Sequence, residues 1–212
     1  WENTNLSFSS KINGVMHACG HDLHICIGLG VAKIIKDLKL NFGTRIIFQP
    51  AEEIASGARW MIKDGATNGL LKILGVHVFP ELSLGTVGIK EGSLTAAAGE
   101  IQVEILGKSG HGARPHEGVD AIWASSKIIS GIQELITRKL DPLDPCVITF
   151  GKINGGNAYN VLAEKVNLVG TVRCTNLKLF KCIDNWLKVN ISSIAKSCGA
   201  EAKVKFREIV PP

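Results

Sequence analysis

The sequence predicts an α/β protein in which part of a parallel-sheet domain is followed by a two-layer βαββαβ domain of the ferredoxin type. Two observations lead to this prediction. Short apolar runs at residues 44–49 and 73–79 are separated by a helical pattern, which is typical of buried parallel strands. Beyond about residue 92 the strand-like runs alternate between apolar and polar residues, which is typical of a sheet with one exposed face.

Two helices are expected around the apolar runs of the first region. Asp22 is a candidate N-cap, and apolar residues at helical spacing after it predict a helix over residues 23–38. Residues 56–65 predict a second, short helix that ends at Gly65. The order strand, helix, strand indicates a parallel sheet covered on both faces.

The second region has a different order of elements. Its period-two runs predict strands, its 3.6-residue patterns predict helices, and the resulting order is βαββαβ. The expected elements are strand 99–108, helix 121–140, strands 146–153 and 164–175, helix 179–199 and strand 200–209. We therefore place a domain boundary near residues 90–95 and assign residues 1–91 and 92–212 to the two domains.

Composition excludes several classes of protein. The chain has 212 residues, 45% of them hydrophobic, so it is too apolar for disorder and long enough for one or two domains. Its net charge of +5 is spread out without a block of five like charges, so no nucleic-acid or membrane surface is predicted. No apolar run is long enough for a membrane span, and no signal peptide is visible. Six cysteines without a CxxC pair favour a reducing, cytoplasmic compartment.

One short motif concentrates metal-binding side chains. In "HACGHD", Cys19 and His21 lie two residues apart in an expected loop before a helix, so a thiolate and an imidazole can face one ion. Glu52 and Glu53 follow the first predicted strand, and His77 lies in the second. Ligands at the ends of neighbouring parallel strands converge at one edge of the sheet. Each residue alone would more often be a core or solvated side chain, but their grouping at element boundaries predicts a metal site.

Three more polar residues lie in this motif or just after it, and their roles are open to more than one interpretation. Asp22 could orient the imidazole of His21 or simply cap the helix, and the residues favour neither alternative. His17 could support a ligand from outside the coordination sphere. His24, in the first helical turn, is expected to be packed or solvated.

Several motifs in the same order resemble one enzyme family. They are "GVMHACGHD", "FQPAEE", "GVHVFPELSLGTVGIKEG", "GKSGHGARPHEGVDAI" and "GGNAYNV...GTVRC". From about Phe8 to Pro212 the chain resembles the metal-dependent amidohydrolases of the hippurate hydrolase, N-acyl-amino-acid amidohydrolase and auxin-conjugate hydrolase group. These enzymes belong to the aminoacylase and carboxypeptidase-like co-catalytic metallopeptidase superfamily. The resemblance implies a partial di-metal catalytic domain over residues 1–91 and a ferredoxin-like lid or dimerisation domain over residues 92–212.

The resemblance also implies roles for the residues of the first domain. Cys19, His21, Glu53 and His77 correspond to the metal ligands, and Glu52 corresponds to the general base. The implied cofactors are two divalent ions, Zn²⁺ or Mn²⁺ with Co²⁺ open, because the donors mix thiolate, imidazole and carboxylate. A base has to stay off the ions to move a proton, which agrees with a division of labour between the adjacent glutamates.

The implied roles in the second domain concern the substrate. His111 corresponds to a histidine that reaches the other subunit's active site and stabilises the oxyanion, while His116 is expected to be structural. Asn160 and Arg173 correspond to a substrate-binding pair, and a guanidinium suits the free carboxylate of an amino acid. From the residues alone, His111 could be a solvated loop histidine and Arg173 an ordinary strand-edge charge.

We therefore expect an enzyme that cleaves the amide bond of N-acyl amino acids and works as a homodimer through the second domain.

Two departures from the family pattern stand out. A further histidine ligand of the resembling enzymes would lie beyond Pro212, and "NVLAEK" replaces the usual proline-containing turn after Asn160. Two alternatives stay open: an inactive fragment, or a non-catalytic binding or dimerisation module of the same fold. Too few strands are present in residues 1–91 to close a covered sheet, so exposed apolar surface is expected there.

Overall fold

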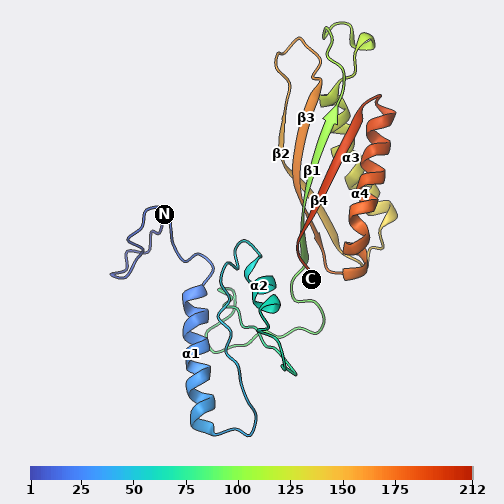
Figure 1. The fold of residues 1–212 in the computed structure, drawn as a ribbon. Coiled ribbons are helices and arrows are strands. Elements are labelled where there is room, and N and C mark those ends of the chain that lie inside the picture. Colours follow the sequence, from blue (N-terminus) through green and yellow to red (C-terminus); the bar gives the residue numbers. More distant parts are fainter. Residues whose placement is uncertain (212) are drawn as a thin grey trace. The chain divides into compact units, whose positions relative to one another are not determined.

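The structure, a computed structural model, describes residues 1–211 and divides into two compact units (Figure 1). The first unit is Trp1–Ile89 and the second is Lys90–Pro212. The sequence placed the boundary two residues later, between residues 91 and 92. The residues expected to bind metal all lie in the first unit, and those expected to contact substrate all lie in the second.

Helix α1 opens the regular structure of the first unit and spans His21–Leu38. Its N-cap is Gly20, whose φ of 73° lies in the left-handed region that glycine adopts without strain. The capping role predicted for Asp22 is therefore wrong. Asp22 lies inside the first turn, and no side chain caps the helix. A Cβ atom on Gly20 would lie 2.4 Å from Cγ2 of Val78, so the loop before α1 can turn here only with glycine.

Helix α2, Gly57–Lys63, is the second helix of this unit, and Gly65 follows it with a φ of 86°. The parallel sheet predicted for this region is not confirmed. Neither residues 44–49 nor residues 73–79 are assigned to a strand. A strand is defined by its hydrogen-bonded neighbour, and no ladder joins these two segments in the described part of the unit.

The two apolar runs nevertheless contact α1. A Cβ on Gly28 would lie 3.3 Å from the ring of Phe48, so the helix packs closely on the first run at this glycine. The backbone N–H of Val78, in the second run, donates a hydrogen bond of 3.0 Å to Nε2 of His24. No residue of α1 is buried, and Leu38 is 61% exposed. The expectation of exposed apolar surface in residues 1–91 is thus confirmed.

The second unit has the predicted element order. The elements are β1 Ala97–Leu106, the 3₁₀ helix η1 Pro115–Glu117, α3 Ala121–Lys139, β2 Cys146–Gly155, β3 Lys165–Cys174, α4 Leu177–Ser197 and β4 Glu201–Val210. The strands form one antiparallel sheet in the order β2-β3-β1-β4 (Figure 1). The βαββαβ order and this strand arrangement are those of a ferredoxin-like sandwich.

Both helices of this unit pack on one face of the sheet (Figure 1). Alternate residues of β1 are buried there, as the period-two pattern predicts. Asp120 caps α3 through Ile122 and Trp123, and Asn176 caps α4. The largest fully buried side chains of the core include Ile101, Ile105, Ile128, Ile132, Leu168, Phe180, Leu187 and Ile191.

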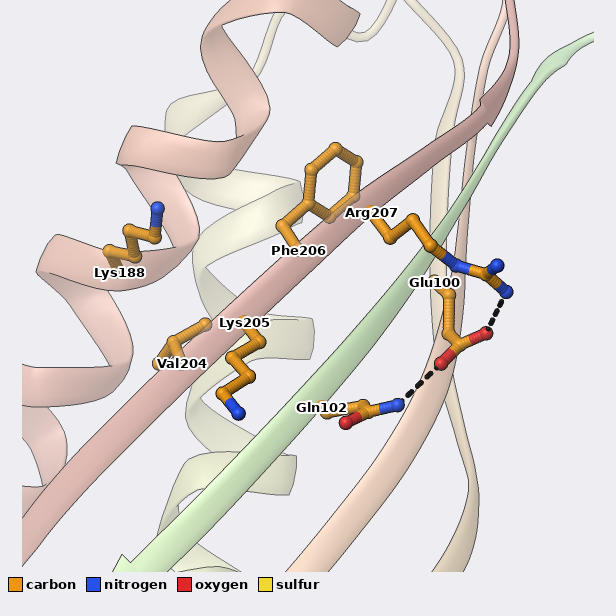
Figure 2. A pocket seen from close by; sticks show the side chains of 7 residues that line it. All are labelled: Glu100, Gln102, Lys188, Val204, Lys205, Phe206 and Arg207. Atoms are coloured by element: carbon orange, nitrogen blue, oxygen red, sulfur yellow. Dashed lines mark hydrogen bonds and ion pairs between the residues drawn. The ribbon is translucent and has the colours of Figure 1, made fainter.

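The other face of the sheet is polar. Glu100 on β1 accepts hydrogen bonds from Arg207 at 2.7 Å and from Gln102 at 2.6 Å, whereas Phe206 turns to the opposite face (Figure 2). The bond from Arg207, followed by that from Gln102, holds the pKa of Glu100 below its usual value. Four residues further along β1, on the same face, Glu104 pairs with Lys165 and Lys203. These cross-strand pairs suit a sheet face in contact with water.

Among the described residues, no helix combines the length and the apolar character needed to cross a membrane.

Candidate metal centre

Two glycines fix the loops that carry the candidate ligands. Gly20 lets the chain turn between Cys19 and the first residue of α1, His21, so both side chains project from one tight turn. Gly57 likewise lets the chain pack tightly beside the loop of the two glutamates. A Cβ atom there would lie 1.5 Å from the carbonyl oxygen of Pro50, which means that α2 begins directly against the loop that holds Glu52 and Glu53.

The glutamate loop is itself strained. Ala51 and Ala55 have φ values of 53°, a conformation that costs a non-glycine residue about 1–2 kcal/mol. The backbone N–H of Ala55 closes the turn by donating to the carbonyl of Glu52 at 2.7 Å. Strain of this kind persists only where the surroundings determine the backbone, and here it orients two adjacent carboxylates.

Three of the predicted ligands form one compact set. The donor atoms of Cys19, His21 and Glu53 all lie within 4.8 Å of one another. Nε2 of His21 is 3.7 Å from Oε1 of Glu53. Cys19 and His21 are half-buried and Glu53 is exposed, so the set is open to solvent on the side of the carboxylate.

His77 joins this set through Cys19. Its Nε2 lies 3.3 Å from Sγ of Cys19, and its Nδ1 lies 2.7 Å from the carbonyl oxygen of Val78. Because a carbonyl only accepts hydrogen bonds, Nδ1 carries the proton and the lone pair of Nε2 faces the thiol. This is the tautomer that a metal ligand requires, held in place by a backbone group.

Glu52 contacts the donor set through His21. Oε2 of Glu52 is 3.3 Å from Nε2 of His21, which is closer than Glu53 comes to the same atom. The side chains of Glu52 and Glu53 are 57% and 71% exposed. Both carboxylates are therefore reachable from water, but only Glu53 belongs to the compact set with Cys19.

His24 has a role that the sequence prediction left undecided. Its ring lies 4.4 Å from that of His77 and 5.6 Å from that of His21, and its Nε2 accepts the hydrogen bond from Val78. Desolvation, followed by the neighbouring imidazoles of His77 and His21, lowers the pKa of His24. A neutral His24 therefore ties α1 to the segment that carries His77. His24 follows His21 by three residues on the same helix face, and this spacing could have indicated that His24 lies beside the candidate ligands.

The second unit brings two of its three predicted residues together. His111 forms a β-bridge with Val161, and the N–H of Gly112 donates to the carbonyl of Asn160 at 2.8 Å. The N–H of Ala113 donates to Nδ1 of His111 at 3.1 Å. Nδ1 is therefore an acceptor, and Nε2 carries the proton of the neutral ring. His111 thus presents an N–H donor to its surroundings from an exposed loop.

Arg173 lies at the other end of the same sheet. It pairs with Ala98 near the start of β1, whereas the loop of His111 follows the end of β1, where Leu106 pairs with Lys165. Arg173 lies eight residue steps along β3 from Lys165, which at about 3.3 Å per step is about 26 Å. The guanidinium of Arg173 is exposed. Within one chain, the structure does not bring the predicted substrate-binding pair together.

The remaining predicted residues have no defined role at the site. His17 is exposed in the loop before the ligands, and His116 lies exposed in η1, where its Nε2 is 3.8 Å from Glu117. The orientation of an imidazole by Asp22 stays a prediction.

The donor set fits a transition-metal ion. One thiol, two imidazoles and a carboxylate are ligands that Zn²⁺ prefers, while the carboxylate also suits Mn²⁺ or Co²⁺. The set is preformed by backbone turns, so binding would not require the loops to refold.

Replacing Cys19 with serine is expected to weaken Zn²⁺ binding by the full-length protein at least about 100-fold, because a neutral hydroxyl replaces the thiolate. Competition with a chromophoric chelator measures the change. Cys26→Ser is the matched control, since Cys26 is an exposed thiol in α1. Equal Zn²⁺ affinity in the two variants would remove Cys19 from the site.

Known proteins resemble this chain over nearly its whole length. The chain is 46% identical to a probable hydrolase of Synechocystis sp. over 99% of its own length and 54% of that protein. It is 38% identical to N-acetylcysteine deacetylase of Bacillus subtilis (strain 168), over 99% of this chain and 56% of the deacetylase. The crystal structure of a Bacillus subtilis dinuclear metal binding peptidase from the M20 family matches with a TM-score of 0.83 and 35% identity, over 99% of this chain and 54% of the other.

The chain thus spans about half the length of the curated relatives it matches. The model of peptidase family M20/M25/M40 matches residues 1–206, which include every candidate ligand and every predicted substrate contact. The resemblance read from the motifs is confirmed, and the chain belongs to peptidase family M20/M25/M40.

Proposed function

We propose that the protein containing this chain is a metal-dependent amidohydrolase that converts N-acyl amino acids to a carboxylic acid and a free amino acid. The observation that supports this most strongly is the convergence of Cys19, His21 and Glu53, with His77 on one side and Glu52 on the other. A pure binding module would not need the second carboxylate, because Glu53 already supplies the oxygen donor. Family membership and a relative named N-acetylcysteine deacetylase support the same reaction.

The proposed cofactors are two divalent cations, held on this chain by Cys19, His21, Glu53 and His77. The dinuclear metal site named for the related Bacillus subtilis peptidase supports this number. Such ions supply Lewis acidity, which polarises the amide carbonyl and makes water more acidic. The thiolate favours Zn²⁺, and Mn²⁺ or Co²⁺ are the alternatives that the carboxylate leaves open.

Glu52 is the proposed general base and acid. Its carboxylate is solvent-accessible and contacts His21, so it can take a proton from a water molecule beside the ligand set. The same carboxylate then delivers the proton to the amine nitrogen as the C–N bond breaks. Glu53 cannot share this task while its oxygen serves as a ligand. The tight turn through Ala51 holds the two carboxylates in these different positions.

His111 is the proposed oxyanion donor. The N–H of Ala113 fixes the proton of its ring on Nε2, which is the atom that has to donate to a developing negative charge. Asn160 lies against the same loop and can bind a polar group of the same substrate. Arg173 is the proposed partner of the amino-acid carboxylate, for which a guanidinium gives a bidentate contact.

The length of the sheet connects these assignments to a dimer. The loop of His111 and the position of Arg173 lie at opposite ends of β3, roughly 26 Å apart along the backbone, and an acyl amino acid is shorter than this, so we infer that His111 and Arg173 of one chain do not contact the same substrate molecule. If both contact substrate, they belong to different copies. A symmetric homodimer would give each active site an Arg173 from one copy and a His111 from the other.

The proposed compartment is the reducing cytoplasm, as the cysteine spacing predicts.

An activity assay on the full-length protein tests the proposed reaction. The substrates are N-acetyl and N-benzoyl amino acids, and the matched control is the same acyl compound with its carboxylate converted to an amide. We expect metal-dependent release of the amino acid, with a clear preference for the free carboxylate. Absence of turnover by the metal-loaded dimer would favour the alternative of a binding or dimerisation module.

A further inference from the structure

Two cysteines outside the candidate metal centre lie in direct contact. Cys146 is the first residue of β2 and Cys174 is the last residue of β3, and the register places them opposite each other. Their sulfur atoms are 3.2 Å apart. The remaining free thiols, Cys26, Cys182 and Cys198, have no such contact with another cysteine among the hydrogen bonds of the described residues.

The local pairing of the strands suits a covalent bond. The N–H of Thr175 donates to the carbonyl of Pro145 at 3.4 Å, so the pair next to Cys146 and Cys174 is the hydrogen-bonded one. In an antiparallel ladder the two kinds of pair alternate, which makes the cysteines a non-hydrogen-bonded pair. Side chains come closest at such pairs, and their Cα and Cβ separations fall near those that a disulfide needs.

The two thiols differ in accessibility and in acidity. Cys146 is half-buried, whereas Cys174 is buried in the core of the sandwich. The thiol of Cys174 donates to the sulfur of Cys146. This hydrogen bond lowers the pKa of Cys146, and the same contact followed by burial raises the pKa of Cys174. Cys146 is therefore the thiol that an oxidant can reach and that ionises first.

We propose that Cys146 and Cys174 form a reversible intramolecular disulfide on exposure to a low-molecular-weight disulfide such as oxidised glutathione. The thiolate of Cys146 attacks one sulfur of glutathione disulfide, forms a mixed disulfide and releases one glutathione thiolate. Cys174 then loses its proton and attacks the sulfur of Cys146, which expels the second glutathione. The two cysteines lose two electrons and two protons, and one glutathione disulfide becomes two glutathione molecules.

The bond would join two turns that already meet. Asn176, the N-cap of α4, donates from Nδ2 to Oδ1 of Asp144 at 2.7 Å, two residues from each cysteine. A disulfide would add a covalent link beside this polar contact and would close a loop from Cys146 to Cys174 that contains β2 and β3. Only a small approach is needed, from 3.2 Å to the disulfide length of about 2.0 Å. In a reducing compartment such a bond would be transient, as redox-sensing disulfides are.

Peptide mapping of the full-length protein tests the proposal. The protein is treated with oxidised glutathione, its remaining thiols are alkylated under denaturing conditions, and it is digested without reductant. We expect one linked pair of peptides that contains Cys146 and Cys174, the loss of two thiols per chain, and reversal by dithiothreitol. The melting temperature of the oxidised form should rise by about 5–10 °C, because the link restricts the unfolded chain.

Three variants refine the test. Cys174→Ser should keep glutathione attached to Cys146, since the resolving thiol is gone, and Cys146→Ser should leave Cys174 unmodified. Cys182→Ser, at an exposed thiol of α4, is the matched control and should still form the link. The peptide map of the unmutated protein decides without any variant. If Cys146 and Cys174 are both alkylated after oxidation, or if glutathione stays on Cys146 while Cys174 is alkylated, the proposal is wrong.

Discussion

Replacing Glu52 with glutamine is expected to lower kcat for hydrolysis of an N-acetyl amino acid by about 10³-fold and to leave the metal content unchanged. Glutamine keeps the size of the side chain, but it can neither take the proton from water nor return it to the leaving amine. Because Cys19, His21 and Glu53 form the compact donor set without Glu52, metal binding should not depend on this carboxylate. Steady-state kinetics together with metal analysis of the same samples measures both effects.

Two further glutamines make the Glu52 experiment specific. Glu53→Gln should reduce the metal content as well as the rate, because it removes a donor atom from the set. Glu81→Gln changes an exposed glutamate of the same unit and should leave both unchanged. A Glu52→Gln protein with the unaltered rate would show that another group moves the proton.

Replacing His111 with alanine is expected to lower kcat by about 10²-fold to 10³-fold, the effect typical of removing one oxyanion donor. The metal content should again stay constant, because His111 lies in the second unit and all proposed ligands lie in the first. His116→Ala, a change of another exposed histidine in the same loop region, is the matched control. An unchanged rate in His111→Ala would contradict the oxyanion role, and loss of metal would point to a structural one.

Mixing the two inactive proteins tests whether His111 acts in the partner's site. A heterodimer of Glu52→Gln and His111→Ala has one site with both residues intact if His111 crosses the interface. Random exchange makes half of the dimers mixed, so activity should return to about a quarter of the unmutated level. If His111 serves the site of its own chain, every site in the mixture carries one defect, and no activity returns.

The sequence predicted the second unit well because its patterns depend on local alternation. A strand with one buried face needs apolar residues at every second position, and β1 shows this in both sequence and burial. Helix α4 likewise has its buried residues on one face and a polar N-cap, Asn176. These patterns lie within a single helix or strand, so they can be recognised without knowing the rest of the fold.

The first unit was harder to predict because a strand requires a partner. The run at residues 44–49 has the composition of a strand. It packs against α1 at Gly28, but it forms no β-ladder with another segment of the described structure. Composition indicates that a segment can form a strand but not whether a ladder exists. The start of α1 was misplaced for a similar reason. Gly20 is the N-cap through its backbone conformation alone, so the sequence shows no capping side chain at this position.

The grouping of the candidate ligands was only partly predictable. The spacing of Cys19 and His21 before a helix is a local signal, and the structure places the two together. The contact of His77 with Cys19 joins residues 58 positions apart and follows only from the path of the chain. The separation of Arg173 from Asn160 could not be seen without the register of β3, since the two lie only 13 positions apart in sequence. Their functional roles stay predictions.

Gly20 and Gly57 have no reactive group, yet each packs tightly against a segment next to the candidate ligands, Gly20 against Val78 and Gly57 against Pro50. Any side chain at Gly57 would collide with the carbonyl of Pro50, and any side chain at Gly20 would collide with Val78. Variants that replace either glycine should therefore lose function in the way that variants of a metal ligand do. The replaced glycine has no functional group of its own, so its chemistry alone would not indicate this loss.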